Sequence, residues 1–426
     1  MSMRRAAVAV LPLALLVGAC GGGEAGGPAA PAPTSASTPS ASATGSASAD
    51  RPESAPALAQ GELDRRLRDA AWKNDVAQAR RLVRQGADVN AKDDTEQSAY
   101  LVATSEGYLD LLRLTLRHGA KVNDKDSWNG TGLIRAAERG HGLVVGELLR
   151  AGIDRDHVNR IGYQAIHEAI WLGEDTASYA TTVRVLAAGG VALDEVSPSA
   201  GLTPLQMARE RGYDGLERIL ENVTTADLPA GQEAANAALL RAARAGDADG
   251  VAVALRAGAD IETRDGNERT ALLLASTYDR VAVAEVLVAM GASPDALDDR
   301  HDTPWLVTGV TGSVRMLEAL LPANPDLTLR NRYGGLSPIP AGERGHVDYI
   351  RRVVQTDVDL DHVNDLGWTA MLEAIVLGNG NEDYQEIVRI LLAAGADPSI
   401  ADHDGVTPRQ HAERRGYDAI AALLRG

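Results

Sequence analysis

The residues that could carry out chemistry are few and scattered in this chain of 426 residues. The pair His167-Glu168 lacks the second histidine of a zinc-protease helix. His157 and His362 each follow an aspartate, but no thiol or second histidine stands beside either one, and a zinc site needs several such ligands together. Residues 402–405, Asp-His-Asp-Gly, lack the other ligands of a calcium loop. We therefore expect no catalytic residue, no metal site and no cofactor.

The chain has a single cysteine, Cys20, and the residues before it have the order of a secretory signal. Arg4 and Arg5 precede an apolar run over residues 6–17, and small residues follow. The run is too short to span a bilayer as a helix, and one cysteine allows no internal disulfide. We predict that residues 1–19 are a signal peptide. The alternative for Cys20 is an incidental residue after a signal cleaved at Ala19.

The segment Leu-Val-Gly-Ala-Cys over residues 16–20 resembles a bacterial lipobox. That resemblance implies that Cys20 receives a lipid and becomes the new N-terminus. Residues 20–60 are mainly Gly, Ala, Ser, Thr and Pro, a composition that cannot offset its ordering entropy by burial. We therefore expect residues 20–60 to form a disordered linker. The protein would be exported and anchored to the extracytoplasmic face of the cell membrane.

Most of the chain repeats with a period of 33 residues. Gly86, Gly119 and Gly152 lie 33 residues apart, and the same spacing separates Gly258 from Gly291. The segments around them read Arg-Gln-Gly-Ala-Asp-Val-Asn or close variants of it. This pattern resembles the ankyrin repeat. The resemblance implies an all-α solenoid in which each unit has a hairpin-like finger and two antiparallel helices.

The repeats can be counted from the expected starts of their first helices. In the ankyrin pattern a Thr-Pro-Leu-His-x-Ala stretch opens this helix, because Thr caps it and Pro suits its first turn. We expect eleven repeats: 1–5 over residues 61–222, a modified finger or junction over 223–236, and 6–11 over 237–426. The positions that correspond to the Thr are Arg65, Ser98, Thr131, Gln164, Thr203, Ala237, Thr270, Thr303, Ser337, Thr369 and Thr407.

A longer repeat indicates an internal duplication. Residues 138–141, Glu-Arg-Gly-His, recur at 343–346, and residues 156–159, Asp-His-Val-Asn, recur at 361–364. Both offsets are 205 residues, so the second half of the array is a copy of the first. We expect one continuous solenoid with a bend near 223–236. In the ninth repeat, Pro340 is expected to perturb the first helical turn.

The same repeat is lengthened in both copies, and the added residues, 173–182 and 378–386, are expected to form loops between its two helices. These loops offer the carboxylates Glu174, Asp175, Glu382 and Asp383, but no shared histidine or nucleophile. We predict that the chain is not an enzyme. An enzyme with its site in these loops, and a solute-binding lipoprotein that captures a small molecule, remain alternative hypotheses.

The aromatic residues are the candidate binding residues. Phe is absent and there are five Trp. Ankyrin proteins usually contact partners through finger tips and first helices on the concave side, and aromatic residues are frequent interface anchors. Trp305 takes a buried position instead. The alternative is that the other rings pack on neighbouring fingers. The aromatic residues for which the resemblance implies partner contact are Trp72, Trp128, Trp171, Trp368, Tyr163, Tyr278 and Tyr333.

Charge narrows the class of partner. The formal net charge is −17, which argues against binding nucleic acid through a basic patch. Ankyrin stacks offer an open groove rather than the enclosed pocket that small molecules prefer, so no small-molecule substrate is expected. The resemblance therefore implies a lipid-anchored scaffold that binds another, unidentified protein. Exported bacterial ankyrin proteins are linked to oxidative-stress defence, which implies a role in stress defence.

Overall fold

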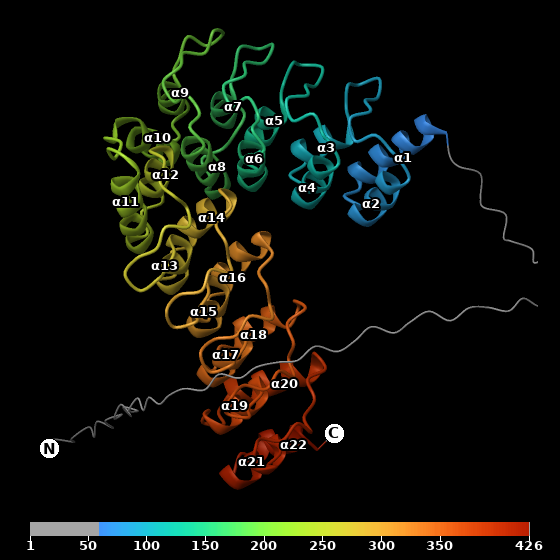
Figure 1. Cartoon of the computed structure of the whole chain (residues 1–426), viewed down its shortest axis with the longest axis vertical. Helices are drawn as coiled ribbons and strands as arrows, with labels where there is room; N and C mark the ends of the chain where they lie inside the picture. The colour runs from blue at the N-terminus through green and yellow to red at the C-terminus, as the bar shows by residue number, and fades with distance from the viewer. Residues whose placement is uncertain (1–58, 426) are drawn as a thin grey trace, which may run out of the picture. The chain divides into compact units, whose positions relative to one another are not determined.

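The computed structural model describes residues 59–425, which form helices joined by turns and loops (Figure 1). The predicted signal peptide, Cys20 and the predicted linker up to residue 58 lie outside the described residues. No strand is found within residues 59–425, and only isolated bridges such as Lys125 with Thr131 mark the fingers. None of the helices in this range combines the length and the apolar character needed to cross a bilayer. The all-α solenoid is therefore confirmed.

The helices form eleven pairs. The first helices are α1 (Gln60–Trp72), α3 (Ala99–Ser105), α5 (Gly132–Glu138), α7 (Ala165–Trp171), α9 (Pro204–Arg211), α11 (Gln232–Ala245), α13 (Ala271–Thr277), α15 (Pro304–Thr311), α17 (Pro338–Arg344), α19 (Ala370–Val376) and α21 (Pro408–Arg415). The second helices are α2 (Val76–Arg84), α4 (Leu109–Arg117), α6 (Gly142–Arg150), α8 (Ala177–Ala188), α10 (Asp214–Thr225), α12 (Ala248–Arg256), α14 (Val281–Ala289), α16 (Val314–Leu320), followed by the 3-10 turn η1 (Leu321–Ala323), α18 (Val347–Val353), α20 (Glu382–Ala393) and α22 (Asp418–Leu423).

Side-chain caps define where most first helices begin. Thr203 accepts a hydrogen bond from the amide of Gln206, whose side chain in turn accepts one from the amide of Thr203. Thr407 and Gln410 form the same reciprocal pair. Ser98, Thr270, Thr303 and Thr369 also cap their helices. These caps satisfy amides that have no partner within the helix.

Two expected helix starts are wrong, and both lie at the beginning of a repeat block. Arg65 lies inside α1, which begins at Gln60, and Ala237 lies inside α11, which begins at Gln232. α11 follows the short connection 226–231 rather than a finger, and neither Ala59 nor Gly231 caps its helix through a side chain. α1 and α11 are also the longest helices of the described chain. The second block thus begins with the same long helix as the first.

The junction between the blocks differs from the expected modified finger. α10 continues to Thr225 and α11 begins at Gln232, so residues 223–225 are helical and only 226–231 connect the two helices. These six residues are too few for both a helix end and a hairpin finger. We call α1 to α10 the first block and α11 to α22 the second block.

The first helix of the ninth repeat, α17, starts at Pro338 as expected, with Ser337 as its N-cap residue. Ser337 already has helical backbone angles and its side chain caps nothing. The Asn331 side chain accepts from the amide of Gly335, as the Asp126 side chain accepts from that of Gly130, so Leu336 rather than Ser337 corresponds to Thr131. Pro340 does not perturb the helix, because it lies in the first turn, where its missing N–H would have no partner.

The lengthened repeat adds both helix and loop, because the connections 172–176 and 377–381 are also longer than the connection 139–141. α8 and α20 have 12 residues each, whereas α6 has nine. The other added residues therefore extend the second helix at its N-terminal end. In both copies a tyrosine in this extension reaches back one repeat: the hydroxyl of Tyr179 donates to the carbonyl of Glu138 at 2.9 Å, and that of Tyr384 donates to the carbonyl of Glu343 at 2.9 Å.

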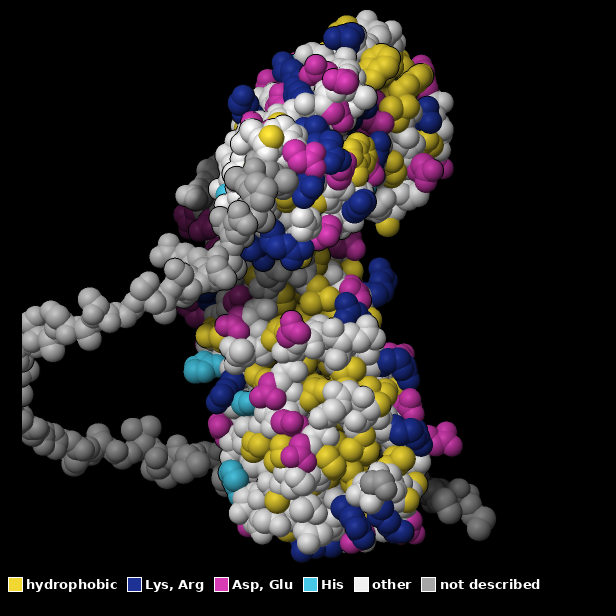
Figure 2. All heavy atoms as spheres, turned by 90° about the vertical axis from the view of Figure 1, so that its right-hand side faces the viewer, with side chains coloured by type: hydrophobic (Ala, Val, Ile, Leu, Met, Phe, Trp, Pro, Cys, Tyr) yellow, Lys and Arg dark blue, Asp and Glu magenta, His cyan; other side chains and the backbone are white. Residues whose placement is uncertain are grey.

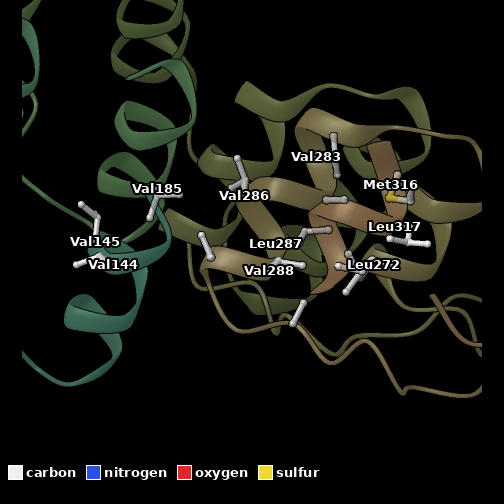
Figure 3. Packing of buried hydrophobic residues seen from close by; sticks show 14 of the residues in the cluster. Val144, Val145, Val185, Leu272, Val283, Val286, Leu287, Val288, Met316 and Leu317 are labelled. Atoms are coloured by element: carbon white, nitrogen blue, oxygen red, sulfur yellow. The ribbon is translucent and has the colours of Figure 1, made fainter. Parts of the chain in front are cut away.

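The second helices of the two blocks pack against each other. α12 and α14 contact α8, and α14 also contacts α6. Figure 3 shows Val185 of α8 and Val286 of α14 on facing sides of this contact, and both are fully buried. A Cβ atom on Gly146 of α6 would overlap the carbonyl oxygen of Ala289 at the end of α14. Glycine at 146 is therefore what permits this approach.

Polar contacts complete the packing between the blocks. Arg184 of α8 forms an ion pair with Asp249 of α12 at 2.6 Å, and Asp249 also accepts from the side chain of Asn222 at 2.7 Å. Arg256 donates to the carbonyl of Val191 at 2.7 Å. Because both charged partners in the Arg184–Asp249 pair are mostly buried, loss of either one would leave an uncompensated charge.

Candidate partner-binding grooves

The aromatic residues predicted to contact a partner fall into three groups by exposure. Four have large exposed rings: Trp72, Trp128, Trp171 and Tyr333. Two are partly buried: Trp368 and Tyr278. Tyr163 is buried, and so is Trp305, as expected from its position. Exposed rings of this size usually mark an interaction surface when they gather with other groups.

Tyr163 does not offer a free surface, which corrects its inclusion among the contact residues. Its side chain is 4 % exposed. Its ring stacks on His167 with centroids 6.1 Å apart and lies 5.9 Å from the ring of Trp171. Tyr163 therefore packs against Trp171 from the buried side, where it supports the exposed ring.

The exposed rings are held by neighbouring groups. The guanidinium of Arg211 lies 5.4 Å from the ring centre of Trp171, and that of Arg332 lies 4.5 Å from the ring centre of Tyr333. Trp128 lies in a finger, where its amide donates to the side chain of Asp126 at 2.8 Å. Cation–π contacts of this kind restrict the ring and reduce the entropy lost on binding.

The duplication places two aromatic pairs at matching positions. Trp128 corresponds to Tyr333 and Tyr163 to Trp368, each 205 residues apart. The backbone contacts match as well: the carbonyl of Trp128 accepts from the amide of Arg160 at 3.0 Å, and that of Tyr333 accepts from the amide of Asp365 at 2.9 Å. The two blocks thus present aromatic rings on equivalent fingers.

A buried Asn–Glu pair lies in each block. The side chain of Asn159 donates to Glu168 at 2.6 Å, and that of Asn364 donates to Glu373 at 2.8 Å. Burial raises the pKa of the Glu168 carboxyl. Burial, followed by the neighbouring Glu343, raises the pKa of Glu373 to about 7. The recurrence of Glu-Ala-Ile at both positions was visible in the sequence, but nothing there indicated that the carboxyl groups are buried.

In the first block an arginine lies among these carboxylates. Arg135 of α5 donates to Glu138 at 2.7 Å and forms an ion pair with Asp126. The same guanidinium lowers the pKa of Glu168 and opposes part of the effect of burial. We call Asp126, Arg135, Glu138, Asn159 and Glu168 the first groove cluster.

The second block has no arginine at the equivalent position. Asn331 replaces Asp126 and Pro340 replaces Arg135, whereas both glutamates of the pair are kept as Glu343 and Glu373. We call Asn331, Pro340, Glu343, Asn364 and Glu373 the second groove cluster. All five line a cavity of about 540 Å³ between the fingers and first helices of the second block.

The carboxylates of the lengthened segments have structural roles. Asp175 accepts from the amides of Gly215 and Leu216 at 2.8 and 3.1 Å, which caps the start of α10. Glu382 and Asp383 lie in the first turn of α20, where negative charge is favourable beside the helix N-terminus. These contacts give the segments a structural function and do not assemble a catalytic group.

The two recurring histidines, His157 and His362, make finger contacts. A ring nitrogen of His157 lies 2.8 Å from the carbonyl oxygen of Asn129, and one of His362 lies 2.6 Å from that of Gly334. Within residues 59–425, no three His, Cys, Asp or Glu residues gather in an arrangement that could hold a metal ion. On the face shown in Figure 2, acidic and basic side chains are interspersed.

Known proteins with similar sequences are ankyrin-repeat proteins. The family description for three ankyrin repeats matches residues 67–159, and that for a single ankyrin repeat matches 267–299 and 366–403. The putative ankyrin repeat protein YahD of Escherichia coli strain K12 is 39 % identical over 186 residues, which are 43 % of this chain and 92 % of YahD.

Two solved structures are similar. An ankyrin repeat domain from Acinetobacter baumannii is 45 % identical, with 44 % of this chain and 95 % of that one covered and a TM-score of 0.43. The ankyrin repeat protein EF0377 is 36 % identical, with 44 % and 96 % covered and a TM-score of 0.43. This chain is 39 % identical to YahD over 92 % of the length of YahD, and it therefore belongs to the family of ankyrin-repeat proteins.

Proposed function

We propose that this protein is a scaffold that binds another protein across the fingers and first helices of its first block. The observation that carries the proposal is the pair of exposed rings, Trp128 and Trp171, which are 55 % and 40 % exposed. Trp171 is supported by Tyr163 and Arg211. Rigid, exposed aromatic side chains provide contact area at a low cost in conformational entropy.

The test is affinity capture from membranes with purified protein carrying single substitutions. Trp128→Ala and Trp171→Ala should each weaken capture of the partner by about tenfold or more, as hot-spot substitutions do. Leu228→Ala is the matched control, because Leu228 is also exposed but lies in the connection between the blocks. Equal capture by the wild type and both Trp variants would contradict the proposal.

We further propose that the protein is exported and held at the extracytoplasmic face of a membrane by a lipid on Cys20, with residues up to 58 as the tether. The order of Arg4, Arg5, the apolar run and the lipobox-like residues supports this. Cys20→Ala should move the protein from the membrane to the soluble fraction or block its processing. Unchanged fractionation and processing would contradict the anchor while leaving partner binding untouched.

The link of exported ankyrin proteins to oxidative-stress defence supports the proposal that the scaffold acts in stress defence. Deleting the gene should then increase sensitivity to hydrogen peroxide, and re-expression of the wild type should restore resistance. Re-expression of Trp128→Ala should not. An unchanged peroxide sensitivity after deletion would exclude this role.

A second candidate, capture of an apolar small molecule, is favoured by one feature of the fold. A cavity of about 590 Å³ lies where the two blocks meet, and its walls include Val144, Val281, Val314 and Ala319. A cavity of this size suits a small apolar ligand. A fluorescent apolar dye should bind there and be lost in Ala319→Trp, which fills the space. Equal dye binding by the wild type and Ala319→Trp would remove this candidate.

A further inference from the structure

The two groove clusters are built alike but balance their charges differently. In the first cluster the Arg135 guanidinium is paired with Asp126 and Glu138 and lies near Glu168. A guanidinium presents its donors in a planar fork that can serve two carboxylates at once. The first cluster thus shows that an arginine fits beside the carboxylate of Glu138, which corresponds to Glu343.

The second cluster keeps the carboxylates of Glu343 and Glu373, but it has Asn331 in place of Asp126 and no arginine at the position of Arg135. Neither Glu343 nor Glu373 forms an ion pair within residues 59–425. Glu373 is 5 % exposed, and its carboxyl has one hydrogen bond, which its Oε1 accepts from Asn364. The second oxygen of Glu373 has no hydrogen bond and, unlike that of Glu168, is not sealed from solvent, so a cation in the cavity can reach it.

The other arginines that line the cavity do not take this place. Arg269 is held by Asp265 at 2.7 Å and Arg332 by Asp302 at 3.5 Å. Arg300 and Arg344 complete the set, and neither is among the groups that shift the pKa of Glu373. The acidic end of the cavity is therefore left for a cation from outside the described chain.

We propose that the second groove binds an arginine side chain of a partner protein through Glu343 and Glu373, at the position where the first groove carries Arg135. This rests on the proposed scaffold function and adds the chemistry of one contact. Ile339 and Pro340 wall the cavity beside the two glutamates, and Leu377 borders it. These apolar side chains suit the methylene stem of an arginine, whose charged end needs the carboxylates.

A direct test uses a blocked pentapeptide with a central arginine and its counterpart with citrulline, which has the same shape without the charge. The full-length protein carries labelled isoleucine methyl groups, because Ile339 lines the cavity and is buried. The arginine peptide should shift the Ile339 methyl signal in a saturable manner and the citrulline peptide should not. Equal shifts with both peptides would overturn the proposal.

Three variants locate the contact. Glu373→Gln and Glu343→Gln should each weaken arginine binding by about tenfold, since a hydrogen bond to a charged group contributes about 1.5–3 kcal/mol. The double variant Asn331→Asp/Pro340→Arg copies the first groove and should abolish binding, because an internal guanidinium then occupies the site. Glu138→Gln is the control in the first block and should leave binding unchanged.

Circular dichroism of each variant separates loss of the site from loss of the fold, and Glu373→Gln should fold well because it removes a buried charge. Unchanged peptide binding in folded Glu373→Gln would refute the inference. The scaffold function is tested independently by capture through Trp128 and Trp171. If capture depends on these rings but the arginine peptide does not bind, only the second-groove inference fails. If the peptide binds but no protein is captured, the scaffold proposal fails.

Discussion

The first groove cluster contains an arginine among its carboxylates, whereas the second does not. Arg135 joins Asp126 and Glu138 in the first block, and Pro340 stands at its position in the second. Around this difference the geometry is unchanged, because Asn159 and Asn364 hold their glutamates at nearly equal distances. The duplication therefore preserved the scaffold while the charge balance of the groove diverged.

The two blocks also differ at a matching position on their second helices. Gly146 of α6 lies against the end of α14, while Arg351, the matching residue of α18, is exposed and paired with Asp348 and Glu386. The same helix position thus packs against the other block in the first copy and is exposed to solvent in the second. Divergence after duplication has thus changed both the groove and the outer face of the second helices.

The largest expected effect is on the free energy of unfolding, and it compares one tryptophan from each block. Trp305 of the second block is 1 % exposed, so Trp305→Ala should lower the free energy of unfolding by about 3–5 kcal/mol. Trp128 of the first block is exposed, and Trp128→Ala should change it by about 0.5 kcal/mol or less. Chemical denaturation followed by far-ultraviolet circular dichroism measures both. Similar losses of stability in the two variants would contradict the difference in burial between Trp305 and Trp128.

The next effect concerns pH and Glu373. Its pKa is about 7 in the folded protein against an ordinary value of 4.5. Because the folded pKa is raised, the stabilising contribution is full below pH 4.5 and is lost as the pH rises through 7. The stabilising contribution that is lost amounts to at most about 3 kcal/mol, at 1.36 kcal/mol for each unit by which folding raises the pKa of Glu373.

Glu373→Gln should remove this part of the pH dependence, so that the variant gains stability relative to the wild type between pH 5 and pH 7.5, as measured by urea denaturation. The matched Glu168→Gln variant should gain less, because the hydrogen bond from Asn159 and the charge of Arg135 oppose part of the rise that burial causes in the pKa of Glu168. A constant difference between Glu373→Gln and the wild type across this range would contradict a raised pKa.

A smaller effect tests the contact between the blocks. Gly146→Arg introduces the residue that the second block carries at the matching position, and overpacking should cost about 1–3 kcal/mol of stability. Arg351→Ala is the control on the exposed copy and should stay within about 0.5 kcal/mol of the wild type. If Gly146→Arg proved as stable as the control, α6 and α14 would not be packed in solution.

The 33-residue period was enough to predict the helix pairs, because each repeat must bury the same apolar positions against its neighbours. Thr203 and Thr407 could be recognised as caps for the same local reason. The starts of α1 and α11 could not be predicted, since neither helix begins at a Thr-like side-chain cap. The packing of α14 on α6 and α8 was also beyond the sequence pattern, because contacts between distant repeats leave no periodic signal.

The candidate site was predicted less completely than the fold. The exposure of Trp128 and Trp171 agrees with their positions in the repeat, but Tyr163 is buried because it supports Trp171. The Asn–Glu pairs were missed as functional residues, since the sequence shows that Glu168 and Glu373 recur but not that their carboxyl groups lose water. Desolvation depends on how neighbouring first helices cover them, which only the folded stack defines.

The smallest predicted effect would convert one groove into the other. In Asn331→Asp/Pro340→Arg, the new guanidinium should pair with the carboxylate introduced at position 331 and with Glu343, as Arg135 pairs with Asp126 and Glu138. An opposite charge near a carboxyl lowers its pKa by about 1–3, so the pKa of Glu373 should fall from about 7 by about 1. Carbon NMR of the Glu373 carboxyl measures this directly. Because the graft also restores a helix amide in the first turn, where none is needed, folding should be unaffected. An unchanged titration of Glu373 in a folded double variant would mean that Pro340 is not what leaves the second groove acidic.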